Sequence, residues 1–169
     1  MGNLIHLRFI LLDISNDIEE LLDSICNLCN LQTLYVKRCR SLKKLPQGMG
    51  ELINLRHLFL GLNNSIGSFP RGILRLSSLR TLIHFKICGK NDSGGSKRGE
   101  LKNLNQIGES LGITGLGNMV DVCEVENAQF KKKIRLRQLY LTFNVKDVDV
   151  DVDKDDRRME NDVLVLNAL

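Results

Sequence analysis

The sequence predicts an α/β solenoid in which a parallel β-sheet forms the concave face and short helices or 3₁₀ turns form the convex face. Two observations support this. Apolar residues recur at a constant step of 24 residues, beginning with Leu7, Leu31, Leu55 and Leu79. The chain of 169 residues also contains no tryptophan and only two tyrosines, so aliphatic side chains must supply most of its core. Stacked aliphatic ladders are typical of a solenoid rather than of a compact sandwich or barrel.

Each repeat begins with the pattern LxxLxL. Alternating apolar residues of a short strand point to the same side, so this pattern predicts a strand with an apolar inner face. One repeat cannot bury that face alone, and neighbouring repeats must stack with their strands parallel and about 4.8 Å apart. The predicted inner columns are Ile10, Leu34, Leu58 and Leu82, followed by Leu12, Val36 and Leu60, with His84 in the fourth place.

The rest of each repeat has a predictable role. Ser15, Cys39 and Asn63 fall where the chain leaves the strand, and we expect their side chains to bond the backbone of adjacent repeats. Proline fixes its own φ and holds the preceding residue extended, so Pro46 and Pro70 end the turn. The segments GMGELINL and GILRLSSL then return as short helices or 3₁₀ turns.

We expect one domain over residues 1–169. After Leu82 the constant step is lost, but Leu111 and Ile113, and later Leu136, Leu139 and Leu141, predict two further strands. A helix is expected from Val122 to Lys133. The predicted segments are regular repeats (1–85), a polar flexible insertion (86–100), irregular repeats (101–143), an acidic loop (144–158) and a terminal helix (159–169).

The motif LCNLQTLYVKRCRSLKKLPQGMGELINLRHL resembles the leucine-rich repeat region of plant intracellular immune receptors, the coiled-coil class of NB-ARC-LRR (NLR) disease-resistance proteins. The segment from ELKNLNQIGESLGITGLGNMVDVCEVENAQFKKK to IRLRQLYLTF is similar to that family in order and spacing. The resemblance implies a horseshoe arc, protein recognition in innate immunity, and effector sensing or restraint of a nucleotide switch. The chain carries no Walker loop or MHD-like motif, so we expect a fragment or truncated member.

Two columns of outward residues are the candidate protein-binding surface. One is apolar, with Leu11, Tyr35, Phe59, Ile83 and Tyr140, and the other is basic, with Arg8, Arg56, Arg80 and Arg137 and with Gln32 in the second repeat. The apolar column fits either partner binding or cross-strand packing. The basic column fits either an acidic partner or a solvated face. The predicted protein-binding residues are Arg8, Leu11, Tyr35, Lys37, Arg56, His57, Phe59, Arg80, Ile83, Arg137 and Tyr140.

Other classes of function find little support. The net charge of +4 is modest, and the basic runs at 37–44 and 131–137 lack the interleaved aromatics of nucleic-acid readers. No catalytic constellation, cofactor motif, small-molecule site or membrane span is predicted, and the acidic stretch 149–160 lacks the glycine of a calcium loop. Five irregularly spaced cysteines, including Cys26 and Cys29, predict buried or semi-buried thiols.

The expected partner is a pathogen effector, a host guardee or an NB-ARC domain, in the cytoplasm, with the nucleus as an alternative. Two other classes stay open. A freestanding leucine-rich repeat adaptor in intracellular signalling would carry capping elements at its ends. An extracellular receptor would carry a secretion signal, paired cysteines and a glycine before its Ile-Pro turn, a feature that only residues 66–70 approach.

Overall fold

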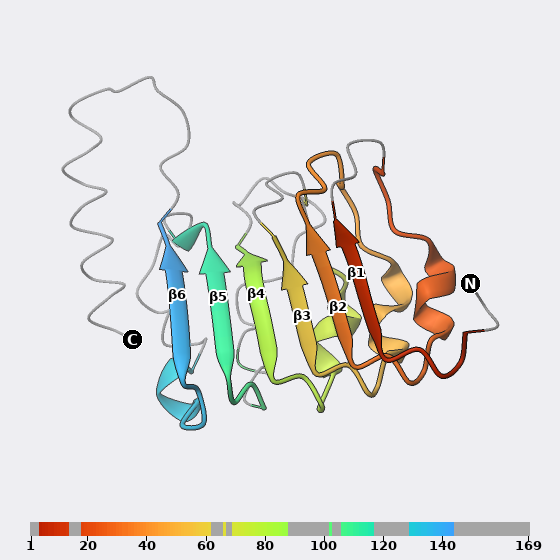
Figure 1. Cartoon of the computed structure of the whole chain (residues 1–169). Coiled ribbons are helices and arrows are strands. Elements are labelled where there is room, and N and C mark those ends of the chain that lie inside the picture. Colours follow the sequence, from red (N-terminus) through yellow and green to blue (C-terminus); the bar gives the residue numbers. More distant parts are fainter. Residues whose placement is uncertain are drawn as a thin grey trace, which may run out of the picture.

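The structure is a computed structural model that describes residues 4–13, 18–61, 66, 69–87, 102, 106–116 and 129–143. These residues form one parallel sheet whose six strands lie side by side in chain order (Figure 1). The strands are β1 (Phe9–Asp13), β2 (Thr33–Lys37), β3 (His57–Leu60), β4 (Thr81–Lys86), β5 (Ser110–Thr114) and β6 (Gln138–Thr142). The predicted parallel sheet is therefore confirmed, including the two strands beyond the regular repeats.

Short 3₁₀ turns complete the repeats. They are η1 (Asp23–Asn27), η2 (Gln47–Glu51), η3 (Arg71–Arg75) and η6 (Phe130–Lys132). The first three lie on one side of the sheet and stack in the same order as the strands (Figure 1). Since Pro46 and Pro70 directly precede η2 and η3, the predicted role of proline at the end of the turn is confirmed.

The constant step between repeats is the register of the sheet. Phe9 pairs with Thr33, Thr33 with His57, and His57 with Thr81. Equal spacing places equivalent residues of successive repeats opposite one another, so each inner column becomes a continuous ladder. Leu34, Leu58 and Leu82 are each 0% exposed, which confirms the first of the predicted columns in the middle of the sheet.

His84 is the exception, and its predicted inward place is wrong. The pairing of β4 with β5 shifts between Leu82 and Phe85, and His84 has a φ of 67°. The extra residue makes a β-bulge, which lets the chain turn the phenyl ring inward instead of the imidazole. Phe85 is consequently 2% exposed, and its ring centroid lies 4.8 Å from that of Phe69. Partial burial lowers the pKa of His84 below its ordinary value.

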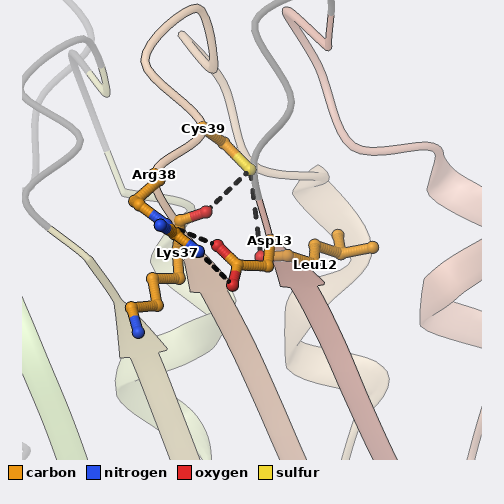
Figure 2. Close-up of polar contacts among 5 residues, drawn as sticks. All are labelled: Leu12, Asp13, Lys37, Arg38 and Cys39. Carbon is orange, nitrogen blue, oxygen red and sulfur yellow. Dashed lines mark hydrogen bonds and ion pairs between the residues drawn. The ribbon is translucent and has the colours of Figure 1, made fainter.

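The polar position after the strand behaves as predicted in the second repeat (Figure 2). The Cys39 thiol donates to the carbonyl of Lys37 at 3.5 Å and reaches the carbonyl of Leu12, in the preceding repeat, at 4.0 Å. Beside it, Arg38 donates through Nε and Nη2 to both carboxylate oxygens of Asp13, at 2.8 and 2.7 Å. A thiol is a weak donor, and the guanidinium–carboxylate pair therefore supplements it in holding the two repeats together.

A second set of contacts, which the sequence did not predict, joins successive repeats just before β2 and β3. The side-chain amide of Asn30 donates to the carbonyl of Ile5 at 2.7 Å, and that of Asn54 donates to the carbonyl of Cys29 at 2.8 Å. The two asparagines are separated by one repeat length, so the same contact recurs between successive repeats. These contacts satisfy turn carbonyls that belong to neither the sheet nor the 3₁₀ turns.

Replacing Asn54 by alanine is expected to lower the free energy of unfolding by about 0.5–1.5 kcal/mol, the usual net contribution of one intramolecular hydrogen bond. The loss leaves the carbonyl of Cys29 to solvent. Urea unfolding monitored by circular dichroism measures the change. Asn27→Ala is the matched control, because Asn27 is an exposed asparagine whose side chain forms no such contact with the described residues; an equal loss in both variants would contradict a stabilising role of the Asn54 contact.

Glycines allow the 3₁₀ turns to stack closely. A Cβ added to Gly72 would lie 2.8 Å from both the Cα and the N of Gly50, in the neighbouring turn. A Cβ on Gly48 would lie 3.1 Å from the Cβ of Cys26 in the same manner. Small residues at these places bring the backbones of successive turns together, which the apolar pattern of the sequence does not reveal.

Several predicted segments fall wholly or partly outside the described residues. These are most of the insertion 86–100, residues 122–128 of the predicted helix, the acidic loop 144–158, the terminal helix 159–169, and the ladder positions Ser15 and Asn63. Within the described part, β4 continues to Lys86, and Ile87 is 2% exposed. Phe130–Lys132, near the end of the predicted helix 122–133, forms the 3₁₀ turn η6.

Candidate functional site on the concave sheet face

The outward side chains of the strands form aligned columns on the concave face. We call the following set the apolar column, although its fifth member carries no side chain: Leu11, Tyr35, Phe59, Ile83, Gly112 and Tyr140. The predicted members therefore do lie in one row, with Gly112 of β5 inserted between Ile83 and Tyr140. Gly112 pairs with Tyr140 in the register of β5 and β6.

The apolar column differs along its length. In its middle, the rings of Tyr35 and Phe59 stack with centroids 4.8 Å apart and planes inclined by 23°. Both side chains are half-buried by this contact, which matches the predicted alternative of cross-strand packing. At the ends, Leu11 is 51% exposed and Tyr140 is 54% exposed. The two ends are consequently the parts of the column that remain open to a partner.

Gly112 creates a hollow in the concave face, which we call the Gly112 hollow. Its volume is about 380 Å³, and its walls include Phe59 and Ile83 on one side and Tyr140 on the other. A side chain at position 112 could fill the hollow only with strain. Its Cβ would lie 3.0 Å from the backbone N of His84 and 3.3 Å from the Cα of Ile83. The bulge in β4 thus explains why a glycine stands in this row.

A second row precedes the strands, and we call it the arginine column. It contains Arg8, Gln32, Arg56, Arg80, Glu109 and Arg137, and backbone hydrogen bonds connect consecutive members. Glu109 was missed by the sequence analysis, although a signal for it exists. Counting back two residues from Leu111 gives Glu109, as counting back from Leu82 gives Arg80. The basic column is therefore interrupted by one carboxylate in the fifth repeat.

Glu109 is held in place by its neighbours on the sheet. The Thr81 hydroxyl donates to Oε2 of Glu109 at 3.2 Å and lies 3.1 Å from Nδ1 of His57, while Nδ1 of His57 lies 3.6 Å from Oε2 of Glu109. Thr81 is 3% exposed, so these contacts satisfy a buried hydroxyl. His57 thus forms part of a contact chain that runs from β3 through β4 to Glu109, the residue directly before β5.

A groove of about 800 Å³ runs along the starts of the last strands, and we call it the arginine groove. Its lining includes Arg56, Arg80, Arg135 and Arg137, with Glu109 as the acidic member. All four arginines are exposed. Their guanidinium groups present planar pairs of donors that suit carboxylate or phosphate oxygens.

The remaining predicted site residues lie at the other end of the sheet. Arg8 is exposed before β1, far along the arginine column from Arg137, and Lys37 is exposed at the end of β2. The positive charge of the basic run around Lys37 is largely neutralised by ion pairs with acidic side chains. Lys43 and Lys44 form ion pairs with Glu19 and Glu20, both at 2.9 Å. These pairs are exposed and add little stability, but they reduce the positive potential of this edge.

The second basic run includes a buried residue. Lys133 is 4% exposed, and burial lowers its pKa to about 8. It occupies the place that leucine holds in earlier repeats, since Leu76 and Lys133 each precede a strand-opening leucine by three residues. Lys133 is therefore part of the packed interior of its repeat, whereas Arg135 and Arg137 remain on the surface.

Metal and thiol chemistry find no support in the described part of the chain. Cys26 is buried, and desolvation raises the pKa of its thiol, with smaller contributions from Asp23 and Glu51. Cys29 is exposed, which differs from the predicted buried or semi-buried thiol. Over the described ranges, no group of three His, Cys, Asp or Glu residues could hold a metal ion. The acidic stretch 149–160 lies outside those ranges.

None of the helices within the described residues has the length and apolar character needed to cross a membrane.

These features define the class of protein: stacked strands with LxxLxL cores and an open sheet face form a leucine-rich repeat solenoid. Residues 1–114 match a family model described as a leucine-rich repeat region, which is more than half of the chain, and the chain therefore belongs to the leucine-rich repeat family. Residues 99–169 match the R13L1/DRL21 leucine-rich repeats, a family of the plant NLR type. Together the matches support a leucine-rich repeat region of a plant resistance protein.

A comparison with curated proteins gave no match. Leucine-rich repeat families are generally protein-interaction modules without enzymatic activity. The class of function that follows from the family is thus protein binding.

Proposed function

We propose that this chain is a protein-recognition module of plant innate immunity that binds its partner on the concave sheet face. The partner is a pathogen effector, a host guardee or the nucleotide-binding domain of a resistance protein, and binding takes place in the cytoplasm or nucleus. The observation that supports the proposal is the exposure of the apolar column at Leu11 and Tyr140, on a sheet whose other side is filled by the leucine core.

A binding experiment tests this proposal. The purified chain is immobilised and offered candidate effectors and a nucleotide-binding domain supplied in trans, and dissociation constants are measured by surface plasmon resonance. For the partner that binds, a double variant with Leu11→Ala and Tyr140→Ala is expected to weaken binding by about tenfold or more, because exposed apolar anchors dominate such interfaces.

Ile53→Ala is the matched control. Ile53 is 63% exposed but lies after η2, away from the strands, so its loss should leave binding unchanged. Equal binding by the double variant and the unmodified chain, with unchanged circular dichroism spectra, would contradict recognition by the concave face. Binding of signalling proteins without binding of any effector or nucleotide-binding domain would favour the adaptor alternative.

A further inference from the structure

We infer that the part of the concave face over β4, β5 and β6 binds an extended acidic segment of a partner protein that carries one large aromatic or aliphatic residue. The apolar side chain occupies the Gly112 hollow, and the carboxylates meet the arginine groove. This inference rests on the proposed function and specifies the chemistry of the partner and its place on the sheet.

The Gly112 hollow has the features of a socket for one side chain. It is open to the concave face, its exposed lining is mainly apolar, and it lies between the ring of Tyr140 and the side chains of Phe59 and Ile83. A Cβ at position 112 would crowd the backbone of His84, so this position carries a glycine and no side chain of β5 occupies the space in front of it. A partner side chain placed there would bury the exposed face of Tyr140 and gain an aromatic contact.

The arginine groove adjoins the hollow. Glu109 and Arg137 line the groove, while the next residues along the strands, Ser110 and Gln138, line the hollow. The Ser110 hydroxyl donates to Oε1 of Gln138 at 2.7 Å, which closes the boundary between the two depressions with a cross-strand hydrogen bond. A segment of a partner can therefore contact both depressions along the same strands.

The charge of the groove indicates the sign of the partner. Four exposed arginines face one carboxylate, and the backbones of Arg56 and Arg80 belong to neighbouring repeats, whose strands lie about 4.8 Å apart. Like charges on adjacent strands repel one another, so carboxylates between them relieve an existing repulsion in addition to forming bidentate pairs. Glu109 stands between Arg80 and Arg137 in the arginine column, and the groove keeps an excess of positive charge because four arginines line it together with this one carboxylate.

The spacing of the two depressions defines the spacing of the partner's residues. Arg137 precedes Tyr140 by three residues, which corresponds to about 10 Å along an extended strand. An extended peptide covers the same length in about three residues. The preferred segment thus carries its acidic residues about three positions from the apolar anchor.

Fluorescence anisotropy with the full chain tests this inference. The probe is a labelled synthetic peptide with one tryptophan. Two adjacent glutamates stand about three and four positions before the tryptophan, and the other residues are glycine and serine. The control peptides replace the tryptophan by alanine or both glutamates by glutamine. We expect the probe to bind, and each control peptide to bind about tenfold more weakly or worse.

Variants of the chain locate the binding site. Tyr140→Ala and Arg137→Gln are expected to weaken probe binding by about tenfold each. Ile53→Ala and Arg75→Gln are the matched controls, since they change an exposed apolar and an exposed basic residue on the 3₁₀-turn side of the repeats, away from the concave face. They should leave probe binding unchanged.

The inference fails if the probe does not bind, if both control peptides bind as well as the probe, or if the two pairs of variants behave alike. It also fails if a labelled single-stranded RNA of similar length binds more tightly than the probe, because the groove then serves nucleic acid. The proposed function is tested separately. If the Leu11→Ala and Tyr140→Ala double variant still loses a protein partner, recognition by the concave face stands although the peptide chemistry is wrong.

Discussion

Replacing Leu58 by alanine is expected to lower the free energy of unfolding by about 2–5 kcal/mol, the range for deleting a fully buried leucine side chain. Leu58 lies on β3 and is 0% exposed, with Leu34 and Leu82 opposite it on the neighbouring strands. The loss is a large fraction of the roughly 5–15 kcal/mol that typically stabilises a domain. Urea unfolding followed by circular dichroism gives the change.

The adjacent residue supplies the control for this prediction. Phe59 is larger than Leu58 but points to the concave face, where it stacks on Tyr35 and remains partly exposed. Phe59→Ala should therefore cost only roughly 1–2 kcal/mol, from the lost aromatic contact and partial burial. A larger loss for Phe59→Ala than for Leu58→Ala would reverse the assignment of inner and outer faces. A change in the slope of the unfolding transition would show either that unfolding is no longer two-state or that the compactness of the denatured state has changed.

The sequence was sufficient to predict the ladder of the first four strands. A parallel pairing between identical units requires equal spacing, so the constant step also specifies which residues face each other, as Leu11, Tyr35 and Phe59 do. The inward or outward direction follows from alternation along each strand. These two rules need no knowledge of the loops.

The sequence was insufficient where the step changes. Thr81 pairs with Ser110 and Ser110 pairs with Gln138, and both of these steps are longer than the one that separates His57 from Thr81. With unequal spacing, the register depends on which side chain the core accepts, and the bulge at His84 shows that the core accepted Phe85 instead. The Gly112 hollow depends on that bulge, so its position in the apolar column could not be derived from spacing alone.

Polar contacts across repeats were predicted less well than apolar ones. Cys39 could be assigned because a polar residue after the strand has a known function in this class of repeat. Asn30 and Asn54 share a column too, but an asparagine in a turn commonly bonds its own backbone. Its contact with the preceding repeat depends on the path of the turn, which the sequence does not specify.

Lys133→Leu is expected to raise the free energy of unfolding at pH 7 by roughly 1–3 kcal/mol, because burial disfavours the charged ammonium in the folded chain and each pKa unit corresponds to about 1.4 kcal/mol. The N–H of Lys133 donates to the carbonyl of Phe130 at 2.9 Å, and its own carbonyl accepts from Leu136 at 3.0 Å. Leu76 makes the same two contacts with Ile73 and Leu79. A leucine at position 133 therefore fits the backbone that is already present and restores the inner column of the repeat.

The gain should depend on pH in a defined direction. Burial lowers the pKa of Lys133 from 10.5 to about 8. Above pH 10.5 the amine is neutral in both the folded and the unfolded chain, so its burial lowers the free energy of unfolding only slightly. As the pH falls from 10.5 to 8, the unfolded chain takes up a proton that the folded chain does not, so the unmodified protein loses stability. Below pH 8 both states are protonated, and the difference between variant and unmodified protein reaches its constant maximum.

Unfolding curves recorded from pH 6 to about pH 10.5 measure this dependence, with Lys132→Leu as the matched control. Lys132 is exposed next to Lys133, so its replacement removes the same charge from the same run without removing a buried one. It should leave both the stability and its pH dependence nearly unchanged. A loss of stability in Lys133→Leu at pH 7 would show that the polar contacts of the ammonium outweigh its desolvation. In that case, Lys133 stabilises the folded chain more than a leucine at the same position would.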